Sequence, residues 1–400
     1  MNNDPITIQR GDLKIVACRS GKNYAMKVCK SLEEIAKERN DYIYDKIKKN
    51  EQLTRYERKE RDLINQIEDD DGVYPAITEH QNFGEGRGMG EGERKTIVSD
   101  NLREKDVFLI QNPLNYQTLI EDDIELDNNL MEMFITAGTL WYDKARNISL
   151  VSLYYPYARG DKQHAKDGIP AKIFADMLKS VHINRIITMD LHADQIEGFF
   201  DIHLEHLHAS PLLIYKFKDV FEGKKFDREF VKMGGPDVGS AKKVEYLAKM
   251  LGYGIVLSYK ARDFIKKDTV KTKIIGKIGE DIIIGLIDDI FGTGSTIGEF
   301  QTEADKIGYK EIYVGVTFPI MGGNAIENID KWYDGGKGKF KLLIGTDAIT
   351  QNKEVLDKPW YYEINTSKFV ARALWEIHTA GSVSKLYPPS SVDDLNLWIE

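Results

Sequence analysis

The stretch LIDDIFGTGSTIGEF, residues 286–300, contains the transition that decides the fold. It passes from an apolar run through two acids and a small-residue loop to the start of a helix. The run at 282–287 is apolar and rich in β-branched residues, a pattern typical of a strand buried on both faces of a parallel sheet. Thr296 and Glu299 have capping-box spacing, which predicts a helix starting there. The stretch therefore predicts a strand, a loop and a helix in an α/β protein.

Two adjacent acids, Asp288 and Asp289, end the predicted strand. Both cannot be core residues, but both can accept hydrogen bonds from the vicinal hydroxyls of a sugar. The small residues that follow are Gly292, Thr293, Gly294, Ser295 and Thr296. Backbone N–H groups of small residues can approach an anion closely, and a helix start adds unpaired N–H groups and a positive dipole end. This pattern favours a phosphorylated ribose; the alternative is an ordinary βα loop whose polar residues cap the helix.

Apolar strands alternate with amphipathic helices through most of the chain. The predicted elements are strands at 13–17, 149–154, 185–189, 255–258, 282–287 and 312–318, and helices at 171–182 and 241–251. Such alternation implies parallel sheets with right-handed crossovers. It predicts two tandem α/β units, with parallel sheets flanked by helices.

Composition excludes some classes of protein. A chain of 400 residues can hold two domains, and its formal net charge of −9 argues against a nucleic-acid binder, which needs a clustered cationic surface. Cys18 and Cys29 are too few for a disulfide framework and indicate a reducing compartment. The first residues lack the apolar core of a signal peptide, and no apolar run approaches membrane-spanning length. We expect no membrane partner and a cytoplasmic location.

Two segments have unusual composition. Residues 31–72 are about half charged and have helical periodicity, with a possible apolar stripe at Leu32, Ile35, Tyr42, Ile43 and Ile47. We interpret this segment as a solvated structural insertion, with a partner surface as the alternative. The second segment, NFGEGRGMGEGER at 82–94, matches neither the G-x-G-x-x-G spacing nor a Walker A motif.

The loop at 286–300 resembles the ribose-phosphate loop of type I phosphoribosyltransferases and of the ribose-phosphate pyrophosphokinases. Longer motifs favour the pyrophosphokinases, because simple phosphoribosyltransferases lack them. These motifs are SLYYPYARGDKQHAKDGIPAKIFADMLKSVHINRIITMDLHADQIEGFFDI at 152–202, GGPDVGSAKKV at 234–244, SYKARD at 258–263 and HTAGSVSKLY at 378–387. The resemblance implies two phosphoribosyltransferase-type domains, at 1–208 and 209–386, with residues 387–400 returning to the first. It also implies a homo-oligomer.

The activity implied by the resemblance is transfer of a diphosphoryl group from ATP to the anomeric hydroxyl of ribose 5-phosphate. Such transfer needs cations around in-line oxygens, and Mg²⁺ suits the task because it prefers oxygen ligands and bridges phosphates. The family pattern implies metal-associated roles for His192, beside Asp190, and for Asp237. Without that pattern, a lone histidine is usually structural. Asp237 between Pro236 and Gly239 would equally suit a turn or a helix cap.

Further residues receive roles through the resemblance. Lys260 and Arg262 lie beyond an apparent strand, in a charged stretch that we interpret as a mobile loop closing over the transferring group; an exposed basic loop is the alternative. Arg159 matches an ATP-contacting arginine, whose guanidinium pairs with phosphate or stacks on adenine. Phe83 and Glu85 are candidates for holding the adenine of ATP, against a flexible glycine-rich turn.

Two departures from the family pattern bear on the substrates. Gly160 stands where the family commonly has Gln after the arginine, which removes one adenine or phosphate contact. Gly292 stands where the loop usually carries Asp, which leaves room beside the 5-phosphate for a larger acceptor such as ADP-ribose. Ribose 5-phosphate remains the first choice. A phosphoribosyltransferase acting on a nucleobase would not explain residues 152–202, and a non-catalytic regulatory homologue would not explain the retained His192, Lys260 and Arg262.

Overall fold

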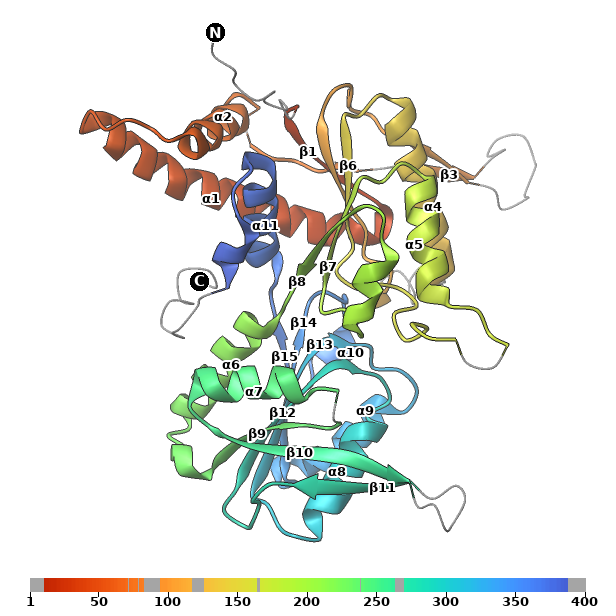
Figure 1. Cartoon of the computed structure of the whole chain (residues 1–400), viewed down its shortest axis with the longest axis vertical. Coiled ribbons are helices and arrows are strands. Elements are labelled where there is room, and N and C mark those ends of the chain that lie inside the picture. Colours follow the sequence, from red (N-terminus) through yellow and green to blue (C-terminus); the bar gives the residue numbers. More distant parts are fainter. Residues whose placement is uncertain are drawn as a thin grey trace. The chain divides into compact units, whose positions relative to one another are not determined.

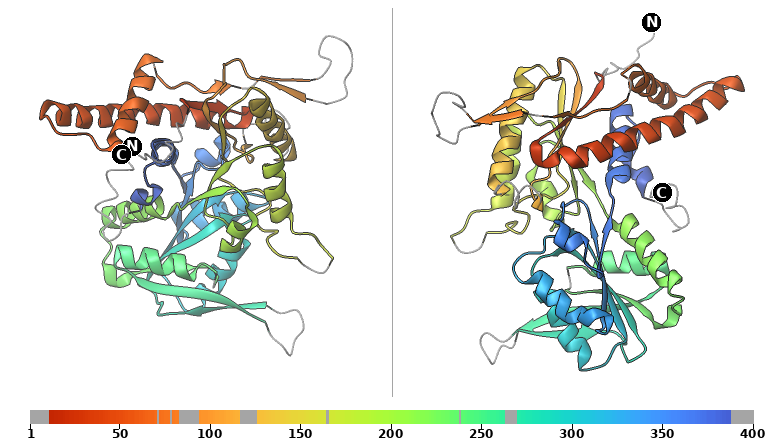
Figure 2. Two further views of the ribbon diagram at one scale, coloured as in Figure 1. Left: turned by 45° about the horizontal axis from the view of Figure 1, so that its top comes forward. Right: turned by 180° about the vertical axis from the view of Figure 1, so that it is seen from behind.

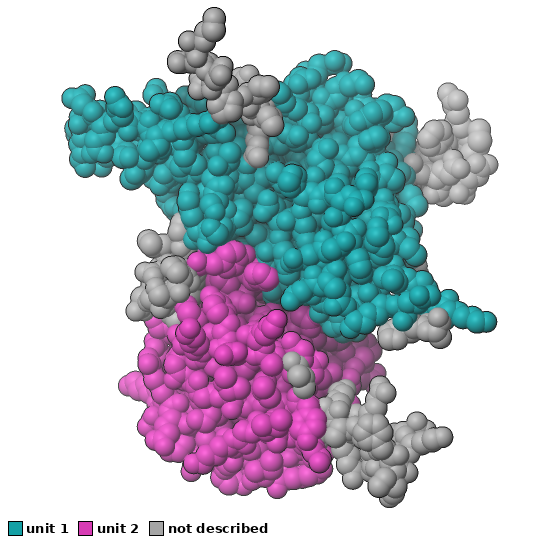
Figure 3. All heavy atoms as spheres, in the orientation of Figure 1, with its two compact units in different colours: residues 1–207, 367–386 teal, residues 208–366, 387–400 magenta. Residues whose placement is uncertain are grey.

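The computed structural model describes residues 11–70, 72–77, 79–82, 94–116, 126–163, 166–237, 239–262 and 270–387. The chain forms two compact units (Figure 3). The first consists of Met1–Leu207 with Ser367–Leu386. The second covers His208–Thr366 and takes in Tyr387, the last residue described. The segment that joins the first unit therefore precedes the 387–400 segment suggested by the resemblance.

The first unit is built on a six-stranded sheet of order β2-β1-β5-β6-β7-β8, in which every neighbouring pair is parallel. Its strands are β1 (Leu13–Ala17), β2 (Ala76–Ile77), β5 (Asp106–Ile110), β6 (Asn147–Val151), β7 (Arg185–Met189) and β8 (His203–Leu207). The middle strands are apolar and buried, which is why they read as continuous hydrophobic runs. A separate antiparallel pair consists of β3 (Glu79–Asn82) and β4 (Arg94–Ile97).

Helices surround this sheet and pack against its side chains (Figure 1). The α-helices are α1 (Lys22–Lys48), α2 (Arg55–Asp69), α4 (Leu126–Tyr142), α5 (Pro170–Ser180) and α11 (Ser367–Thr379), and the 3₁₀ helices are η1 (Arg19–Gly21), η2 (Asp194–Phe199) and η5 (Val383–Leu386). The core includes Leu109, Met133, Leu150, Phe174 and Ile186, all of which are nearly inaccessible to water. Burial of such side chains supplies the main favourable term in folding.

Most of the charged segment at 31–72 lies in two helices, α1, which begins at Lys22, and α2. Both helices lie beside α11 (Figure 2). Glu60 of α2 is 1% exposed and accepts two hydrogen bonds from Arg39 of α1, at 2.9 and 2.6 Å. It also accepts one from Trp375 Nε1 of α11 at 3.0 Å. A buried carboxylate is tolerated because it is paired and hydrogen-bonded. The network therefore joins both ends of the chain.

The apolar stripe predicted for this segment is only partly correct. Leu32, Ile35 and Ile43 are buried, whereas Tyr42 and Ile47 are each 43% exposed. Tyr42 instead lies beside the guanidinium of Arg39, 4.5 Å from the ring centroid, and its hydroxyl donates to Glu57 Oε1 at 3.1 Å. Ile47 is the second-last residue of the 27-residue helix. Helix α2 begins with a capping box, in which Thr54 and Glu57 each accept a hydrogen bond from the other's backbone N–H.

The second unit is built on a seven-stranded sheet of order β11-β10-β9-β12-β13-β14-β15. Its strands are β9 (Val231–Gly235), β10 (Gly254–Arg262), β11 (Val270–Ile275), β12 (Ile283–Phe291), β13 (Glu311–Pro319), β14 (Phe340–Thr346) and β15 (Tyr361–Ile364). All pairs are parallel except β10 with β11, which is antiparallel. The α/β fold class is confirmed, but this sheet is mixed at one edge and not wholly parallel as predicted.

Helices also flank the second sheet (Figure 1). They are α6 (Ser210–Gly223), α7 (Ala241–Leu251), α8 (Ser295–Asp305), α9 (Ala325–Tyr333) and α10 (Lys353–Leu356), with 3₁₀ turns η3 (Arg228–Phe230) and η4 (Asp334–Gly336). The core includes Leu286, Phe300, Val314, Leu343 and Trp360. Among the helices of the described residues, none has both the length and the apolar content that crossing a membrane requires.

Three local predictions in this unit are wrong. The predicted strand at 282–287 extends to Phe291, so Asp288 lies inside β12, paired with Val316 of β13, because the ladder to β13 continues beyond the apolar run. Helix α8 starts at Ser295 after Gly294, with no side-chain cap, so Thr296 and Glu299 do not form the capping box. The charged stretch after 258 is strand through Arg262 and again from Val270, because the two segments pair antiparallel.

Candidate active site

In the first unit, two loops start side by side at the carboxyl edge of the sheet. Leu153, just after β6, accepts hydrogen bonds at its carbonyl from Met189 N at 2.9 Å and Thr188 Oγ1 at 3.0 Å of β7. The first loop carries Arg159, which is exposed. The second carries Asp190 and His192. The structure therefore brings these three residues to one edge of the sheet. The carboxyl ends of neighbouring parallel strands commonly form ligand sites.

The loop after β6 explains one departure from the family pattern. A Cβ atom added to Gly160 would lie 2.9 Å from Cδ and 3.0 Å from Cγ of Pro170, the first residue of α5. Gly160 O also accepts a hydrogen bond from Ala171 N at 3.2 Å. A glutamine here would force the rigid proline ring to shift. Gly160 is therefore required by packing against α5, and the contact that a Gln would make is absent.

The loop after β7 is held in a constrained shape. Asp190 is 7% exposed and has φ of +36°, a left-handed conformation that non-glycine residues rarely adopt. Its N–H donates to Leu207 O of β8 at 2.8 Å. The next N–H, of Leu191, donates to His206 Nε2 at 2.9 Å. His192 follows, and it is exposed, as expected for a residue that meets a ligand. Gln195 of the same loop donates to Asp161 of the loop after β6.

Asp190 and His206 lie close enough for one cation, with potential ligand atoms within 4.8 Å of one another. His206 does not suit that task in this arrangement, because its Nε2 lone pair accepts the Leu191 N–H. Its Nδ1 lies 2.5 Å from Glu197 Oε1 and donates the proton to that carboxylate. Asp190 thus remains an oxygen ligand of the kind that Mg²⁺ prefers, while the imidazole is engaged in holding the loop.

In the second unit, residues 292–296 connect β12 to α8. Gly294 has φ of +80°, and a Cβ atom there would lie 2.9 Å from Phe291 Cζ and 3.0 Å from Trp332 Cη2. Both the backbone conformation and the close packing require glycine at this position. Thr293 and Ser295 on either side are exposed at the N-terminus of the helix. An 11-residue helix presents unpaired N–H groups there, which attract an anion.

The carbonyl groups of this loop are turned toward the segment between β13 and α9. Phe291 O accepts from Ile320 N and Met321 N at 2.9 and 3.2 Å, and Gly292 O accepts from Gly322 N at 3.1 Å. Thr293 O accepts from Asn328 Nδ2 at 3.2 Å. Because successive carbonyls are fixed on one side, the loop is shaped before any ligand binds. Such preorganisation reduces the cost of binding a phosphate.

Asp288 and Asp289 form an acidic pair inside β12. Both are half-buried, Asp289 N donates to Asp288 Oδ1 at 3.0 Å, and Ile290 N donates to Asp289 Oδ1 at 2.9 Å. Burial, the neighbouring Asp289 and the more distant Asp237 together raise the pKa of Asp288 to about 8. A carboxyl group with a raised pKa can accept hydrogen bonds from sugar hydroxyls and, when protonated, can also donate one.

Asp237 is exposed and occupies the turn between β9 and α7. Its Oδ1 accepts from Ser240 N at 3.0 Å, and its carbonyl accepts from Ser240 Oγ at 2.7 Å. The turn role that the sequence offered as an alternative is thus fulfilled. Asp237 also contributes to the negative field at Asp288, so the structure brings it near the acidic pair. Three carboxylates with mutual repulsion favour a bound cation.

The remaining predicted residues are less fully placed. The backbone positions of Lys260 and Arg262 lie at the end of β10, opposite Thr272 and Val270 of β11. Their side chains, and residues 263–269, lie outside what the structure describes. Phe83 and Glu85 also lie outside the described residues.

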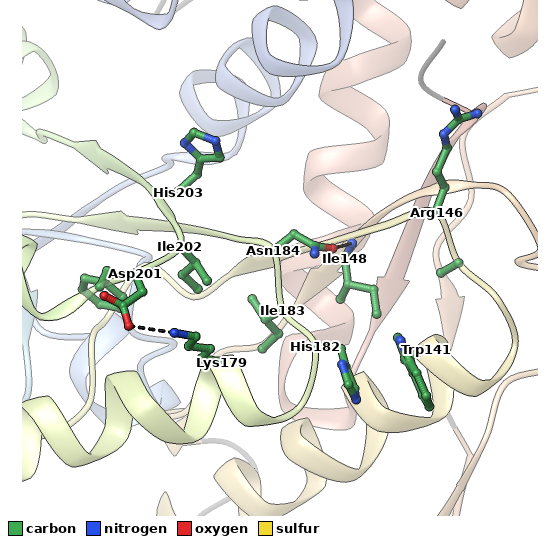
Figure 4. A pocket seen from close by; sticks show the side chains of 12 residues that line it. Trp141, Arg146, Ile148, Lys179, His182, Ile183, Asn184, Asp201, Ile202 and His203 are labelled. Carbon is green, nitrogen blue, oxygen red and sulfur yellow. Dashed lines mark hydrogen bonds and ion pairs between the residues drawn. The ribbon is translucent and has the colours of Figure 1, made fainter. Parts of the chain in front are cut away.

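A cavity of about 790 Å³ lies at the opposite edge of the first sheet, where β6, β7 and β8 begin (Figure 4). Trp141 and His182 stack there with ring centroids 4.1 Å apart, and Lys179 pairs with Asp201 at 2.7 Å. Exposed His203 also lines the cavity. None of the described residues predicted for the site lines it. The loops with Asp190 and Arg159 leave the sheet at its other edge.

Sequence reasoning missed the residues that hold the loops. His206 and Glu197 support the loop after β7, and Asn328 supports the loop after β12. No spacing pattern in the sequence identifies them, because each forms a hydrogen bond with a partner that only the fold brings near. The sequence HLEHL of β8 contains two histidines, but its pattern does not distinguish His206 from His203.

Comparison with known proteins gives a consistent result. Residues 13–181 match the family model of the N-terminal domain of ribose phosphate pyrophosphokinase. The chain is 32% identical over 302 residues to a ribose-phosphate pyrophosphokinase of Bacillus caldolyticus, covering 75% of this chain and 88% of that protein. It is 30% identical over 301 residues to one of Marinomonas sp. (strain MWYL1), covering 75% and 89%.

A solved structure has a similar fold. The crystal structure of phosphoribosylpyrophosphate synthetase from Mycobacterium smegmatis aligns with a TM-score of 0.70 at 21% identity, covering 92% of this chain and 100% of that one. At this identity the likeness concerns the fold. The sequence relatives carry the family assignment.

Proposed function

The chain belongs to the ribose-phosphate pyrophosphokinase family, and from this premise we propose that it transfers the β,γ-diphosphoryl group of ATP to the anomeric hydroxyl of ribose 5-phosphate. The products are phosphoribosyl pyrophosphate and AMP. The observation that carries the choice of acceptor is the sequence of features along β12 and α8. An acidic pair is followed directly by a preshaped loop and a helix N-terminus.

The acceptor is held by two chemistries in the second unit. The carboxyl groups of Asp288 and Asp289 accept hydrogen bonds from the ribose hydroxyls. The backbone N–H groups of residues 292–296, together with the side chains of Thr293 and Thr296, bind the 5-phosphate. Support comes from the carbonyl groups of Phe291, Gly292 and Thr293, which are held by the β13–α9 segment and by Asn328, and from the helix N-terminus that follows the loop.

ATP is assigned to the first unit. Arg159 pairs with its phosphates or stacks on adenine, and exposed His192 lies beside the phosphates that carry the metal. Phe83 and Glu85 are proposed to hold adenine. The residues fit Mg²⁺, since Asp190 is an oxygen ligand in the first unit and Asp237 belongs to a repelling set of carboxylates in the second. When bound, Mg²⁺ neutralises phosphate charge and orients the phosphates.

Lys260 and Arg262 are proposed to contact the transferring diphosphoryl group. Fixed cations stabilise negative charge that spreads over the phosphoryl oxygens in the transition state. Their position at the end of a hairpin, and not in an isolated loop, supports a preset placement on a strand. The nucleophile is the anomeric hydroxyl of the sugar, so the protein mainly positions the reactants and excludes water.

The direct experiment is mass-resolved product analysis after incubation with ATP, Mg²⁺ and either ribose 5-phosphate or ADP-ribose. We expect AMP and a product in which ribose 5-phosphate has gained one diphosphoryl group. A product from ADP-ribose alone would make the larger acceptor the substrate, and would assign Gly292 the role of making room for it. No product from either sugar would contradict pyrophosphokinase activity and favour a regulatory homologue.

A substitution of Lys260 distinguishes a catalytic protein from a regulatory homologue. Lys260→Ala is expected to reduce turnover about 1000-fold, as for loss of a transition-state cation. Lys277→Ala is the matched control, because Lys277 is exposed just after β11 and has no assigned role. Equal turnover in the two variants would remove Lys260 from the mechanism.

The proposal extends to location and assembly. Cys18 and Cys29 are both free and buried, which supports a reducing compartment such as the cytoplasm. We also propose a homo-oligomer. Sedimentation of the purified chain would test this, and a monomer that retains full activity would contradict it.

A further inference from the structure

One imidazole ties together both sides of the segment that carries His192. His206 is the fourth residue of β8, and its ring contacts the neighbouring segment twice. Nε2 accepts from Leu191 N at 2.9 Å, and Nδ1 lies 2.5 Å from Glu197 Oε1. Leu191 immediately precedes His192, and Glu197 lies in η2, five residues after it. The side chain of His206 is only 10% exposed, whereas that of Glu197 is 50% exposed, so the contact with Leu191 is the better shielded of the two.

The two contacts determine the protonation of the ring. A backbone N–H can donate to Nε2 only if Nε2 carries no proton, so the proton of the neutral ring is on Nδ1. That proton is donated to Glu197, whose carboxylate accepts it. The ring therefore acts as an acceptor toward one side of the segment and as a donor toward the other. If the proton were on Nε2 instead of Nδ1, the N–H of Leu191 would face another donor.

The segment needs such support because its first residue is strained. Asp190 has φ of +36°, a conformation that is unfavourable for a non-glycine residue and persists only where its surroundings impose it. The N–H groups of Asp190 and Leu191 are consecutive, and both are held by the end of β8, through Leu207 O and His206 Nε2. Together these contacts fix the direction in which the chain presents His192.

We propose that His206 is a positioning residue for the reaction, which holds His192 and Asp190 in place through Leu191 and Glu197. This inference rests on the proposed function, because it assigns His192 to the ATP phosphates. It gives His206 no contact with substrate or metal. Loss of the contact would let the exposed His192 move, and displacement of a catalytic group by about 1 Å can cost about 100-fold in rate.

The test compares four variants of the full-length chain. His206→Leu removes both hydrogen bonds and keeps an apolar side chain of moderate size. His206→Gln restores an acceptor near the position of Nε2, and Glu197→Ala removes only the partner of Nδ1. His203→Leu is the matched control, because it changes an exposed histidine three residues earlier on the same strand, at the edge away from Asp190.

Two readouts are measured for each variant. For His206→Leu we expect turnover to fall 10- to 100-fold with the KM for ribose 5-phosphate within twofold of wild type, because the acceptor loop belongs to the second unit. The turnover of His206→Gln is expected to recover at least half of that loss on a logarithmic scale. The turnover of Glu197→Ala is expected to be about threefold below wild type. Hydrogen exchange at the Leu191 amide is expected to accelerate in His206→Leu and not in His203→Leu.

The outcomes separate this inference from the proposed function. Wild-type turnover in His206→Leu, or an equal loss in the Leu and Gln variants, would overturn positioning by the hydrogen bond. Unchanged exchange at Leu191 would also overturn it. If the wild-type chain transfers no diphosphoryl group, the proposed function fails, while exchange at Leu191 still decides whether His206 holds the segment. If His206→Leu does not fold, exchange in His206→Gln and Glu197→Ala decides the same question.

Discussion

The loops after β7 and β12 occupy equivalent places at the carboxyl edges of the two sheets, yet they are held differently. The loop after β7 has a non-glycine residue in a left-handed conformation and is held by the side chain of His206 from the next strand. The loop after β12 uses Gly294 for its left-handed position and is held through its own carbonyl groups. A loop that must display side chains tolerates strain and needs an external support. A loop that must display backbone N–H groups obtains its shape from glycine.

The largest expected effect comes from substitutions next to the loop after β12, where we propose that the acceptor sugar binds. Replacing Asp288→Asn and Asp289→Asn together removes the negative charge of the acidic pair and the carboxyl acceptors for the sugar hydroxyls, and should reduce kcat/KM for ribose 5-phosphate by about 100-fold or more. ATP binding to the first unit should change less than threefold, as measured by calorimetry with a non-hydrolysable analogue. Asp281→Asn, an exposed acid just before β12, is the control. An equal loss of ATP binding would show that the effect is not confined to the acceptor.

The next effect tests whether the loop after β12 depends on glycine. Gly294→Ala places a Cβ 2.9 Å from Phe291 at φ of +80°, so we expect a loss of about 2 kcal/mol in the free energy of unfolding and a raised KM for ribose 5-phosphate. Gly279→Ala is the control, because a Cβ there meets no atom within 4 Å. Denaturant unfolding measures both. Equal stability of the two variants would contradict the requirement for glycine.

The acidic pair also predicts a pH dependence of stability. The pKa of Asp288 is raised from its usual 3.8 to about 8, so the folded state holds a proton that the unfolded state has released between these values. The stability contribution is therefore full below pH 4 and is lost as the pH rises toward 8. We expect the melting temperature of Asp288→Asn to decline less than that of wild type between pH 5 and pH 8, by about 3 °C. Identical declines would show that Asp288 is ionised throughout.

The smallest expected effect concerns the side-chain hydrogen bond from Asn328 to a carbonyl group of the loop after β12. Asn328→Ala removes the hydrogen bond to Thr293 O, worth about 1 kcal/mol, and should raise the KM for ribose 5-phosphate about fivefold without a change in kcat. A comparable fall in kcat would mean that Asn328 supports catalysis as His206 does, and would weaken the contrast between the two loops. Steady-state kinetics at saturating ATP distinguish these results.

Much of the fold was predictable because local patterns encode it. The predicted bounds of β1, β7 and α7 agree with the structure to the residue. Prediction was less successful where partners decide the outcome. Strand β12 continues through Asp288 because β13 pairs with it as far as Pro319. The charged stretch after residue 258 is strand through Arg262 and again from Val270 because β10 and β11 pair antiparallel.

The candidate site shows the same division. Asp288, Asp289 and residues 292–296 could be found because acids, glycines and small hydroxyl residues are rare together after an apolar run. His206 and Asn328 could not, because their function depends on reaching a backbone group across the fold. Gly160 is intermediate: the sequence marked it as a departure, and only its contact with Pro170 gives the reason.

The sequence by itself determined the alternation of strands and helices, the acidic pair and the small-residue loop, because these depend on residue type and on spacing within a few positions. Only the tertiary structure decided where the strands end, which histidine supports the loop that carries His192, and that α11 from the far end of the chain packs beside α1 and α2. Those features depend on hydrogen bonds and packing between residues far apart in sequence. No local pattern records such contacts.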